Sequence, residues 1–142
     1  VPSLAVEPSF PQESDKETGR ILVVDDSEAI LKVVDRLLGA RGYDVHLESR
    51  PVAALERVRH EPVDLMLVDI LMPEMNGMQL VKKVLALRPD IKVLMMTGYS
   101  SAGILEQVSE AGLPVLWKPF TPTTLIAQVK DVLNGNTDQA PA

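Results

Sequence analysis

The 142-residue chain contains no cysteine, which excludes disulfide bonds and thiolate metal sites. No apolar run approaches the roughly 20 residues that a membrane-spanning helix needs, so we expect no membrane insertion. The chain also lacks an excess of basic residues, because its formal net charge is -6, and we expect no direct contact with nucleic acid. The absence of cysteine and of a signal-peptide pattern suits a cytoplasmic location.

What the chain does contain is enough apolar sequence for one core. Apolar residues make up 46% of it, and its length suits a single domain. Residues 1–19 carry three prolines and several acids with little apolar periodicity, which predicts a disordered tail or an interdomain linker. Residues 135–142 predict a second disordered tail. The folded unit is therefore expected over residues 20–134.

Short apolar segments alternate with helical patterns along this unit. The predicted strands span residues 20–24, 43–48, 64–68, 91–96 and 114–117. The predicted helices begin after Ser27, at Pro51, at Gly77, at residue 101 and, capped by Thr121, at Pro122. In the second helix Val52, Leu55 and Val58 are expected to face inward. Such alternation predicts an α/β fold, a parallel sheet with helices on both faces.

Polar residues follow four of the five predicted strands. Asp25 and Asp26 follow the first strand, Asp69 the third, Thr97 the fourth and Lys118 the fifth. Ligands of open parallel sheets bind beyond the carboxyl ends of the strands, at the point where the strand order reverses. If these four strands are neighbours, the five side chains share one shallow pocket.

The chemistry of this set points to a metal ion and a phosphoryl group. Carboxylates that lie close together raise one another's pKa, and a hard divalent cation such as Mg²⁺, or Mn²⁺ in its place, relieves the repulsion. Lys118 adds a positive charge that is able to pair with Asp69 or with a bound anion, and Thr97 adds a hydrogen-bond donor. An aspartate such as Asp69 is a known nucleophile for phosphoryl groups.

Four motifs carry a resemblance to a known family. The segments "ILVVDDS", "LMLVDILMPEMNG", "VLMMTGY" and "WKPF" closely resemble receiver domains of two-component response regulators, over about residues 20–134. The resemblance implies a CheY-like, flavodoxin-like fold, a doubly wound sheet of strand order 2-1-3-4-5 flanked by five helices. The acidic, proline-containing leader is similar to the segment before the receiver of a hybrid histidine kinase, so the chain is expected to be such a receiver or a stand-alone regulator.

The resemblance also implies roles for the acidic residues. Asp69 would be the phosphoacceptor. Asp26 would be a direct metal ligand and Asp25 would support the metal mainly through water. The backbone carbonyl of Leu71 would be a further ligand, and Gly77 lies at the end of the loop that carries it.

The remaining roles concern the last two strands. Thr97 would bond a phosphoryl oxygen, and Lys118 would pair with the phosphoryl group, with the bond between Lys118 and Pro119 in the cis form. The family often has an aromatic residue three positions before the lysine, and in those members the aromatic side chain swings inward on phosphorylation. This chain has Val115 at that position, so such a switch lacks its usual residue. The bulky Leu71 and Tyr99 beside the site are expected to shield an acyl phosphate from water.

The expected function is therefore signalling by phosphorylation. A histidine kinase or a histidine phosphotransfer protein would donate the phosphoryl group. The receiver is not an enzyme in the ordinary sense but would assist its own phosphorylation and slow dephosphorylation. Phosphorylation would change the face formed by residues 101–111, 114–117 and 122–133, through which a weak homodimer is also possible.

Several other interpretations fit parts of the pattern. Asp25 and Asp26 could merely cap a helix, and Asp69 could merely pair with Lys118. A Mg²⁺-dependent aspartyl phosphatase usually has a second acid two residues after the nucleophile, where this chain has Leu71. A degenerate receiver that only binds a partner would lack part of the phosphorylation set. A flavin-binding module would need a phosphate-binding loop where Asp25 and Asp26 stand.

Overall fold

The computed structural model describes residues 18–98 and 102–135 of the chain. Most of the two predicted tails, and Tyr99, lie outside the described residues. Strands and helices alternate along the described chain, and no described helix is both long and apolar enough to cross a membrane. The strands are β1 (Arg20–Val24), β2 (Asp44–Glu48), β3 (Leu65–Asp69), β4 (Lys92–Thr97) and β5 (Val115–Trp117). The helices are α2 (Glu28–Gly39), α3 (Pro51–His60), α4 (Gly77–Leu87), α5 (Ala102–Glu110) and α6 (Pro122–Leu133).

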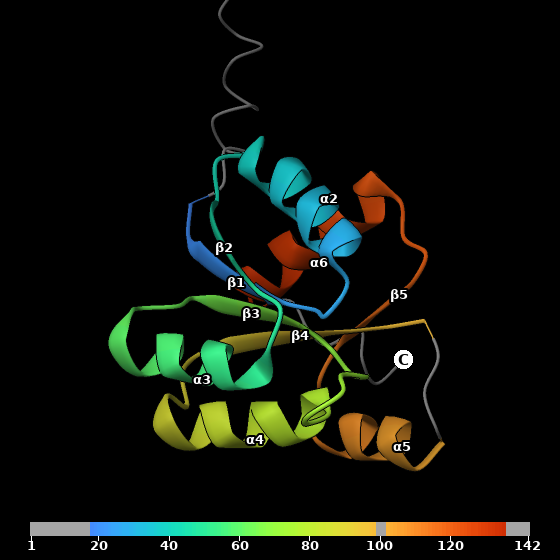
Figure 1. Cartoon of the computed structure of the whole chain (residues 1–142). Helices are drawn as coiled ribbons and strands as arrows, with labels where there is room; N and C mark the ends of the chain where they lie inside the picture. The colour runs from blue at the N-terminus through green and yellow to red at the C-terminus, as the bar shows by residue number, and fades with distance from the viewer. Residues whose placement is uncertain (1–17, 99–101, 136–142) are drawn as a thin grey trace, which may run out of the picture.

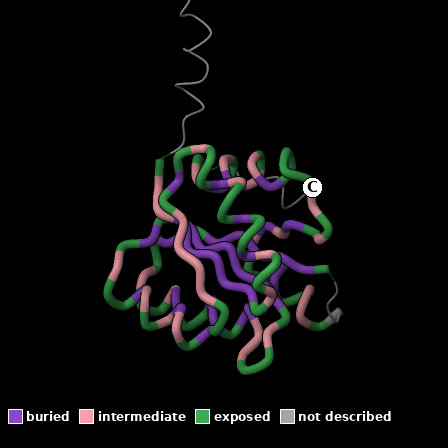
Figure 2. The backbone as a smooth tube through the Cα atoms, turned by 45° about the horizontal axis from the view of Figure 1, so that its top comes forward, coloured by how far each residue is buried: buried purple, intermediate pink, exposed green. Residues whose placement is uncertain are grey.

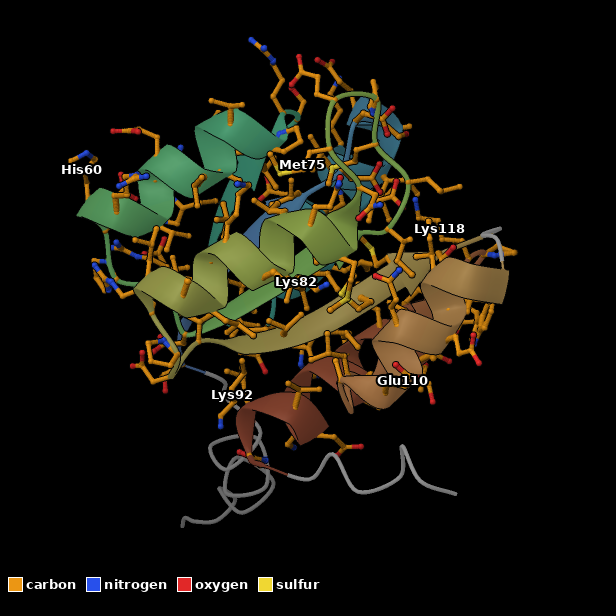
Figure 3. All side chains as sticks on the ribbon, turned by 90° about the horizontal axis from the view of Figure 1, so that it is seen from below. His60, Met75, Lys82, Lys92, Glu110 and Lys118 are labelled. Atoms are coloured by element: carbon orange, nitrogen blue, oxygen red, sulfur yellow. The ribbon has the colours of Figure 1, made fainter. Side chains whose placement is uncertain are left out.

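The strands form one parallel sheet in the order β2-β1-β3-β4-β5, which confirms the predicted doubly wound topology. The helices α2 and α6 cover one face of the sheet, and α3, α4 and α5 cover the other (Figure 1). Figure 3 looks onto the second layer, where His60, Lys82 and Glu110 mark the three helices in turn. The chain turns from β1 outward to β2 and then back to β3 on the other side of β1, so the strand order reverses between β1 and β3.

Two apolar cores lie on the two faces of the sheet, and strand alternation assigns residues to them. Ile21 and Val23 face the core beneath α2 and α6, whereas Leu22 and Val24 face the core beneath α3, α4 and α5. The central strands are buried on both faces, as Figure 2 shows in purple. Such burial explains why these strands are continuous apolar runs.

The helix starts follow the expected capping chemistry. The Ser27 side chain accepts a hydrogen bond from the backbone N–H of Ile30, and Thr121 accepts one from Thr124. The structure corrects one predicted face. Val52 is 57% exposed, because the buried stripe of α3 consists of Pro51, Ala54 and Val58, and Val52 lies outside that stripe.

The first residue of α4 is set very close to the strand before it. The backbone N–H of Gly77 donates to the carbonyl of Ile70 at 2.7 Å. A Cβ atom on Gly77 would lie 2.4 Å from the carbonyl oxygen of Asp69 and 2.9 Å from the Cα atom of Ile70. Both neighbours are backbone atoms, so no side-chain rotation relieves the clash. Glycine at this position fixes where the loop after β3 returns to the sheet.

Gly77→Ala should therefore lower the free energy of unfolding by about 2 kcal/mol or more, because overpacking against backbone forces the loop or α4 to move. Denaturant unfolding of the purified chain measures this loss. Gly103→Ala is the matched control, since a Cβ atom there meets nothing within 4 Å, and it should leave stability unchanged or raise it by up to about 1 kcal/mol. Equal stability of the two variants would contradict the argument.

Candidate functional site

Three carboxylates meet at the carboxyl end of the sheet, where the strand order reverses. Asp25 and Asp26 directly follow β1, and Asp69 ends β3. One oxygen of each of these three residues lies within 4.8 Å of the others. Asp25 is completely buried and Asp69 is 6% exposed, whereas Asp26 is exposed to solvent. The sheet topology thus brings together the three acids that the sequence predicted as neighbours.

Lys118 brings the positive charge, from the end of β5. Its Nζ atom lies 2.8 Å from Oδ2 of Asp25 and 3.5 Å from Oδ2 of Asp69. The sequence had suggested Asp69 as its partner, but the shorter contact is with Asp25. Among the described residues, one ammonium therefore pairs with two of the three carboxylates, and the group carries a net negative charge when all three are ionised.

Backbone groups hold the acidic side chains in place. The N–H of Ser27 donates to Oδ1 of Asp25 at 2.9 Å, and the N–H of Leu71 donates to Oδ1 of Asp69 at 3.2 Å. The backbone N–H of Asp25 donates to the carbonyl of Glu48 at 3.2 Å. Sequence reasoning had assigned Ser27 only as a helix cap. Its backbone contact with Asp25 follows from the tight turn between β1 and α2.

The end of β4 lies beside Lys118. Thr97 is fully buried, and its backbone carbonyl accepts a hydrogen bond from the N–H of Lys118 at 2.8 Å. A Cβ atom on Gly98 would lie 3.3 Å from Cβ of Lys118, so the glycine leaves room for the lysine side chain to run toward the acids. The bond between Lys118 and Pro119 is cis, as the resemblance implied.

The charges and burial of the site shift two pKa values. Burial, and then the neighbouring charge of Asp25, raise the pKa of Asp69 to about 6, against the lowering effects of Lys118 and of the Leu71 N–H. Burial acts to lower the pKa of Lys118, but the hydrogen bond to Asp25 and the charge of Asp69 outweigh it and keep that pKa above its ordinary value. The site therefore favours a protonated lysine and resists full ionisation of its carboxylates.

The donor set fits a hard divalent cation. All of its side-chain donors are carboxylate oxygens, and Asp26 is open to solvent, so a bound ion would keep water ligands there. Mg²⁺ usually keeps several waters and is held in proteins by one or two carboxylates. Both oxygens of Asp25 already accept hydrogen bonds from protein groups, from Ser27 and Lys118. These contacts suit a supporting role for Asp25 rather than direct ligation.

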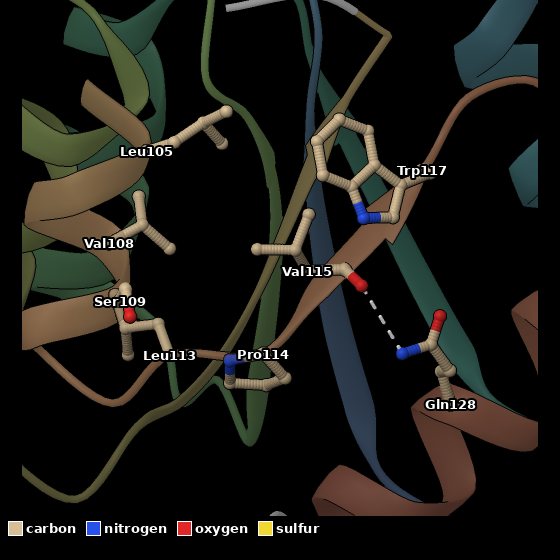
Figure 4. A pocket seen from close by; sticks show the side chains of 8 residues that line it. All are labelled: Leu105, Val108, Ser109, Leu113, Pro114, Val115, Trp117 and Gln128. Carbon is tan, nitrogen blue, oxygen red and sulfur yellow. Dashed lines mark hydrogen bonds between the residues drawn. The ribbon is translucent and has the colours of Figure 1, made fainter. Parts of the chain in front are cut away.

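Beside the site, β5 lies at the base of an apolar hollow of about 400 Å³ (Figure 4). Val115 lies between α5 and α6 in this hollow, and its carbonyl accepts a long hydrogen bond of 3.4 Å from Nε2 of Gln128. Trp117 borders the same hollow and is 54% exposed. Val115 and Trp117 face the same side of the sheet because strand residues alternate, and the small valine leaves the space open.

One contact of the loop that follows β3 had no signal in the sequence. Arg50, which precedes α3, donates from its guanidinium to Oε2 of Glu74 at 2.8 Å. Glu74 lies in the loop between β3 and α4. The two residues are 24 positions apart, so only the packing of the two connections brings them together.

Comparison with known proteins places the chain in a family. The family model for the response regulator receiver domain matches residues 21–130, which is most of the chain, and the chain belongs to this family. The transcriptional regulatory protein ZraR of Escherichia coli K12 is 40% identical over 114 residues, or 80% of this chain but 26% of ZraR. The chain thus spans about a quarter of the length of that relative.

Solved structures agree with this assignment. A CheY-like response regulator receiver domain protein from Methanospirillum hungatei JF-1 matches with a TM-score of 0.79 and 33% identity, over 87% of this chain and 99% of that one. The receiver domain from the hybrid histidine kinase CckA matches with a TM-score of 0.70 and 34% identity, over 81% of this chain and 99% of that one. The chain is therefore a receiver domain of the kind that two-component signalling uses, with the acidic pocket of its family.

The raised pKa of Asp69 predicts a pH-dependent stability in the absence of divalent metal. The folded state binds this proton more tightly than the unfolded chain, whose aspartate pKa is about 3.9, so the free energy of unfolding should fall as pH rises from about 4 to about 6. Asp69→Asn removes the destabilisation that comes from ionising Asp69 in the folded state. We expect the variant to be more stable than wild type by about 1 to 3 kcal/mol at pH 8, and the gain to disappear near pH 4.

Denaturant unfolding across this pH range in a chelator measures the difference. Asp35→Asn removes the same charge from an exposed position on α2, and its stability relative to wild type should show no comparable rise. Added Mg²⁺ should narrow the gap between Asp69→Asn and wild type, because the cation stabilises the ionised wild-type site. An advantage of Asp69→Asn that shrinks as pH rises would contradict the assignment of the pKa.

Proposed function

We propose that this receiver domain accepts a phosphoryl group on Asp69 from a phosphohistidine donor. The observation that carries the proposal is the meeting of three carboxylates with Lys118 at the carboxyl end of the sheet, and β4 ends beside Lys118 in the buried Thr97. A carboxylate pair alone would serve to cap a helix, and an aspartate with a lysine alone would be an ion pair. The complete set is what a phosphoryl group on a carboxylate requires.

In the proposed step, an oxygen of the ionised Asp69 attacks the phosphorus atom of a phosphohistidine. The new bond joins the Asp69 oxygen to phosphorus, and the bond between phosphorus and the histidine nitrogen breaks. The departing nitrogen keeps that electron pair and takes up a proton, so neutral imidazole leaves. Lys118 stabilises the oxygens of the transferred group by its charge, and the Thr97 hydroxyl donates a hydrogen bond to one of them.

Asp26, Asp69 and the carbonyl of Leu71 would hold the metal ion directly, and Asp25 would support it. A bound Mg²⁺ would supply the positive charge that neutralises the phosphoryl oxygens during transfer. The three acids need such a charge, since Lys118 is a single ammonium placed between Asp25 and Asp69.

The proposed phosphodonor is a histidine kinase or a histidine phosphotransfer protein. The proposed receiver domain comprises residues 20–134, and we place its function in the cytoplasm. The domain would act as a stand-alone regulator or as the receiver of a hybrid kinase. The similar proteins include both a transcriptional regulator and a hybrid-kinase receiver.

We further propose that phosphorylation changes the face formed by α5, β5 and α6, where the hollow beside Val115 gives side chains room to rearrange.

The phosphatase interpretation has less support. A hydrolase of this type needs an acid two residues after its nucleophile, and Leu71, 41% exposed, offers no proton there. We therefore propose a phosphoacceptor that assists its own phosphorylation rather than a turnover enzyme.

Incubation with Mg²⁺ and acetyl phosphate, followed by measurement of the intact mass, tests the central proposal. We expect one added phosphoryl group on the wild-type chain and none on Asp69→Asn. Chelation of Mg²⁺ should abolish the addition as well. Lys118→Ala should reduce the phosphorylation rate, because it removes the ammonium that meets the transferred group. An adduct that persists in Asp69→Asn would place the phosphoryl group elsewhere.

The exposed Leu71 gives a prediction about the lifetime of the phosphorylated form. Its backbone N–H bonds to Asp69, and we propose that its apolar side chain limits the approach of water to the acyl phosphate. We expect Leu71→Asn to shorten the half-life several-fold while leaving the mass of the adduct unchanged. Decay of the adduct mass after removal of the phosphodonor measures the half-life, with Leu71→Met as the apolar control. Equal decay of the two variants and wild type would show that Leu71 does not shield the site.

A further inference from the structure

The loop between β3 and α4, residues 70–76, carries the carbonyl of Leu71 and is fixed near both of its ends. At its start the N–H of Leu71 bonds to Asp69. At its end Asn76 and Gln79 form a reciprocal capping box, and the N–H of Gly77 bonds to Ile70. Glu74 lies in the middle of the loop, between these anchors.

Glu74 connects this middle part to a different connection of the fold. Its Oε2 accepts the 2.8 Å hydrogen bond from Arg50. Arg50 stands two residues after Glu48, whose carbonyl accepts the backbone N–H of Asp25. The last residue of β2 therefore contacts the acid that follows β1, and Arg50, two residues further along, contacts the loop that follows β3.

We propose that Arg50 and Glu74 are a positioning pair, which holds the β3–α4 loop and thereby the Leu71 carbonyl that the proposed function assigns to the metal. The inference rests on the proposed function of the site. Neither side chain of a positioning pair needs to contact the three acids, because the pair acts on the metal site only by fixing where the loop lies.

The exposure of the pair limits the size of the effect. The Arg50 side chain is 66% exposed and that of Glu74 is 44% exposed. Exposed ion pairs contribute up to about 1 kcal/mol, so loss of this pair should change an equilibrium constant by no more than about five-fold. Salt should weaken the effect, because the screening length falls from about 10 Å at 0.1 M to about 3 Å at 1 M ionic strength.

Charge reversal separates positioning from a long-range electrostatic effect. Arg50→Glu places two acids at the contact and Glu74→Arg places two arginines there, so positioning predicts weaker metal binding in both variants. A purely long-range effect predicts opposite signs, because Arg50→Glu adds negative charge near the metal and Glu74→Arg removes it. The double variant Arg50→Glu/Glu74→Arg restores an opposite-charge pair and should restore binding.

The experiment measures Mn²⁺ binding to the full chain through the electron paramagnetic resonance signal of the free ion. At low salt we expect each single variant to raise the dissociation constant about two- to five-fold, and the double variant to return to within about 1.5-fold of wild type. At about 1 M NaCl the differences should largely vanish. The acetyl phosphate reaction rate should follow the same order.

Arg59→Glu on α3 and Glu110→Arg on α5 are matched controls. They make the same charge changes at exposed positions, Arg59 in the last turn of α3 at the opposite end of that helix from Arg50 and Glu110 at the end of α5, and they should not reproduce the paired loss and rescue. Thermal unfolding confirms that each variant is folded. If one charge-reversal variant is unfolded, the neutral double variant Arg50→Gln/Glu74→Gln is measured in its place. We expect it to weaken Mn²⁺ binding less than either charge reversal.

Tighter Mn²⁺ binding by Arg50→Glu, or a double variant as weak as the weaker single variant, would overturn the positioning pair. So would unchanged binding in all variants when wild type binds Mn²⁺ and acquires the phosphoryl group. Failure of wild type itself to bind Mn²⁺ or to be phosphorylated would instead overturn the proposed function. The two failures are therefore distinguishable in one set of measurements.

Discussion

Negative charge gathered at the reversal of strand order is the constraint on which the rest of this structure depends. Asp25 and Asp69 are buried within reach of one another, and Lys118 is positioned between them. Burial and the Asp25 charge together raise the pKa of Asp69 to about 6, so full ionisation of the group is costly without a further cation. Three carboxylates beside one lysine suit a divalent cation, which is the charge that the proposed phosphoryl transfer would need.

Holding such a charge cluster requires tight backbone placement around it. Gly77 and Gly98 matter because a side chain at either would press on the backbone of β3 or on Lys118. Backbone N–H groups of Ser27 and Leu71 direct the carboxylates of Asp25 and Asp69. The site is thus built by the ends of strands and the connections that follow them, and the rest of the sheet and its helices supply a rigid base.

The sequence allowed much of this to be predicted because apolar runs in it end abruptly in polar residues. In a parallel sheet, such endings place Asp25, Asp69 and Thr97 along one edge, and no side-chain detail is needed to foresee it. The inward face of α3 was predicted less well. The buried stripe of α3 includes the small residue Ala54, whereas the larger Val52 is exposed. Hydrophobicity alone gave no reason to place Ala54 rather than Val52 on the buried side. The roles assigned to the individual site residues remain predictions.

By itself, the sequence determined the α/β class, the positions of the strands and the set of residues that gather at their ends, since local periodicity and capping chemistry act over a few neighbouring residues. Only the tertiary structure decided that Lys118 lies nearer to Asp25 than to Asp69, that Val115 leaves a hollow beside β5, and that Arg50 meets Glu74. These features depend on distances between segments far apart in the chain. Such distances are set by how whole helices pack on the sheet, and no local pattern encodes them.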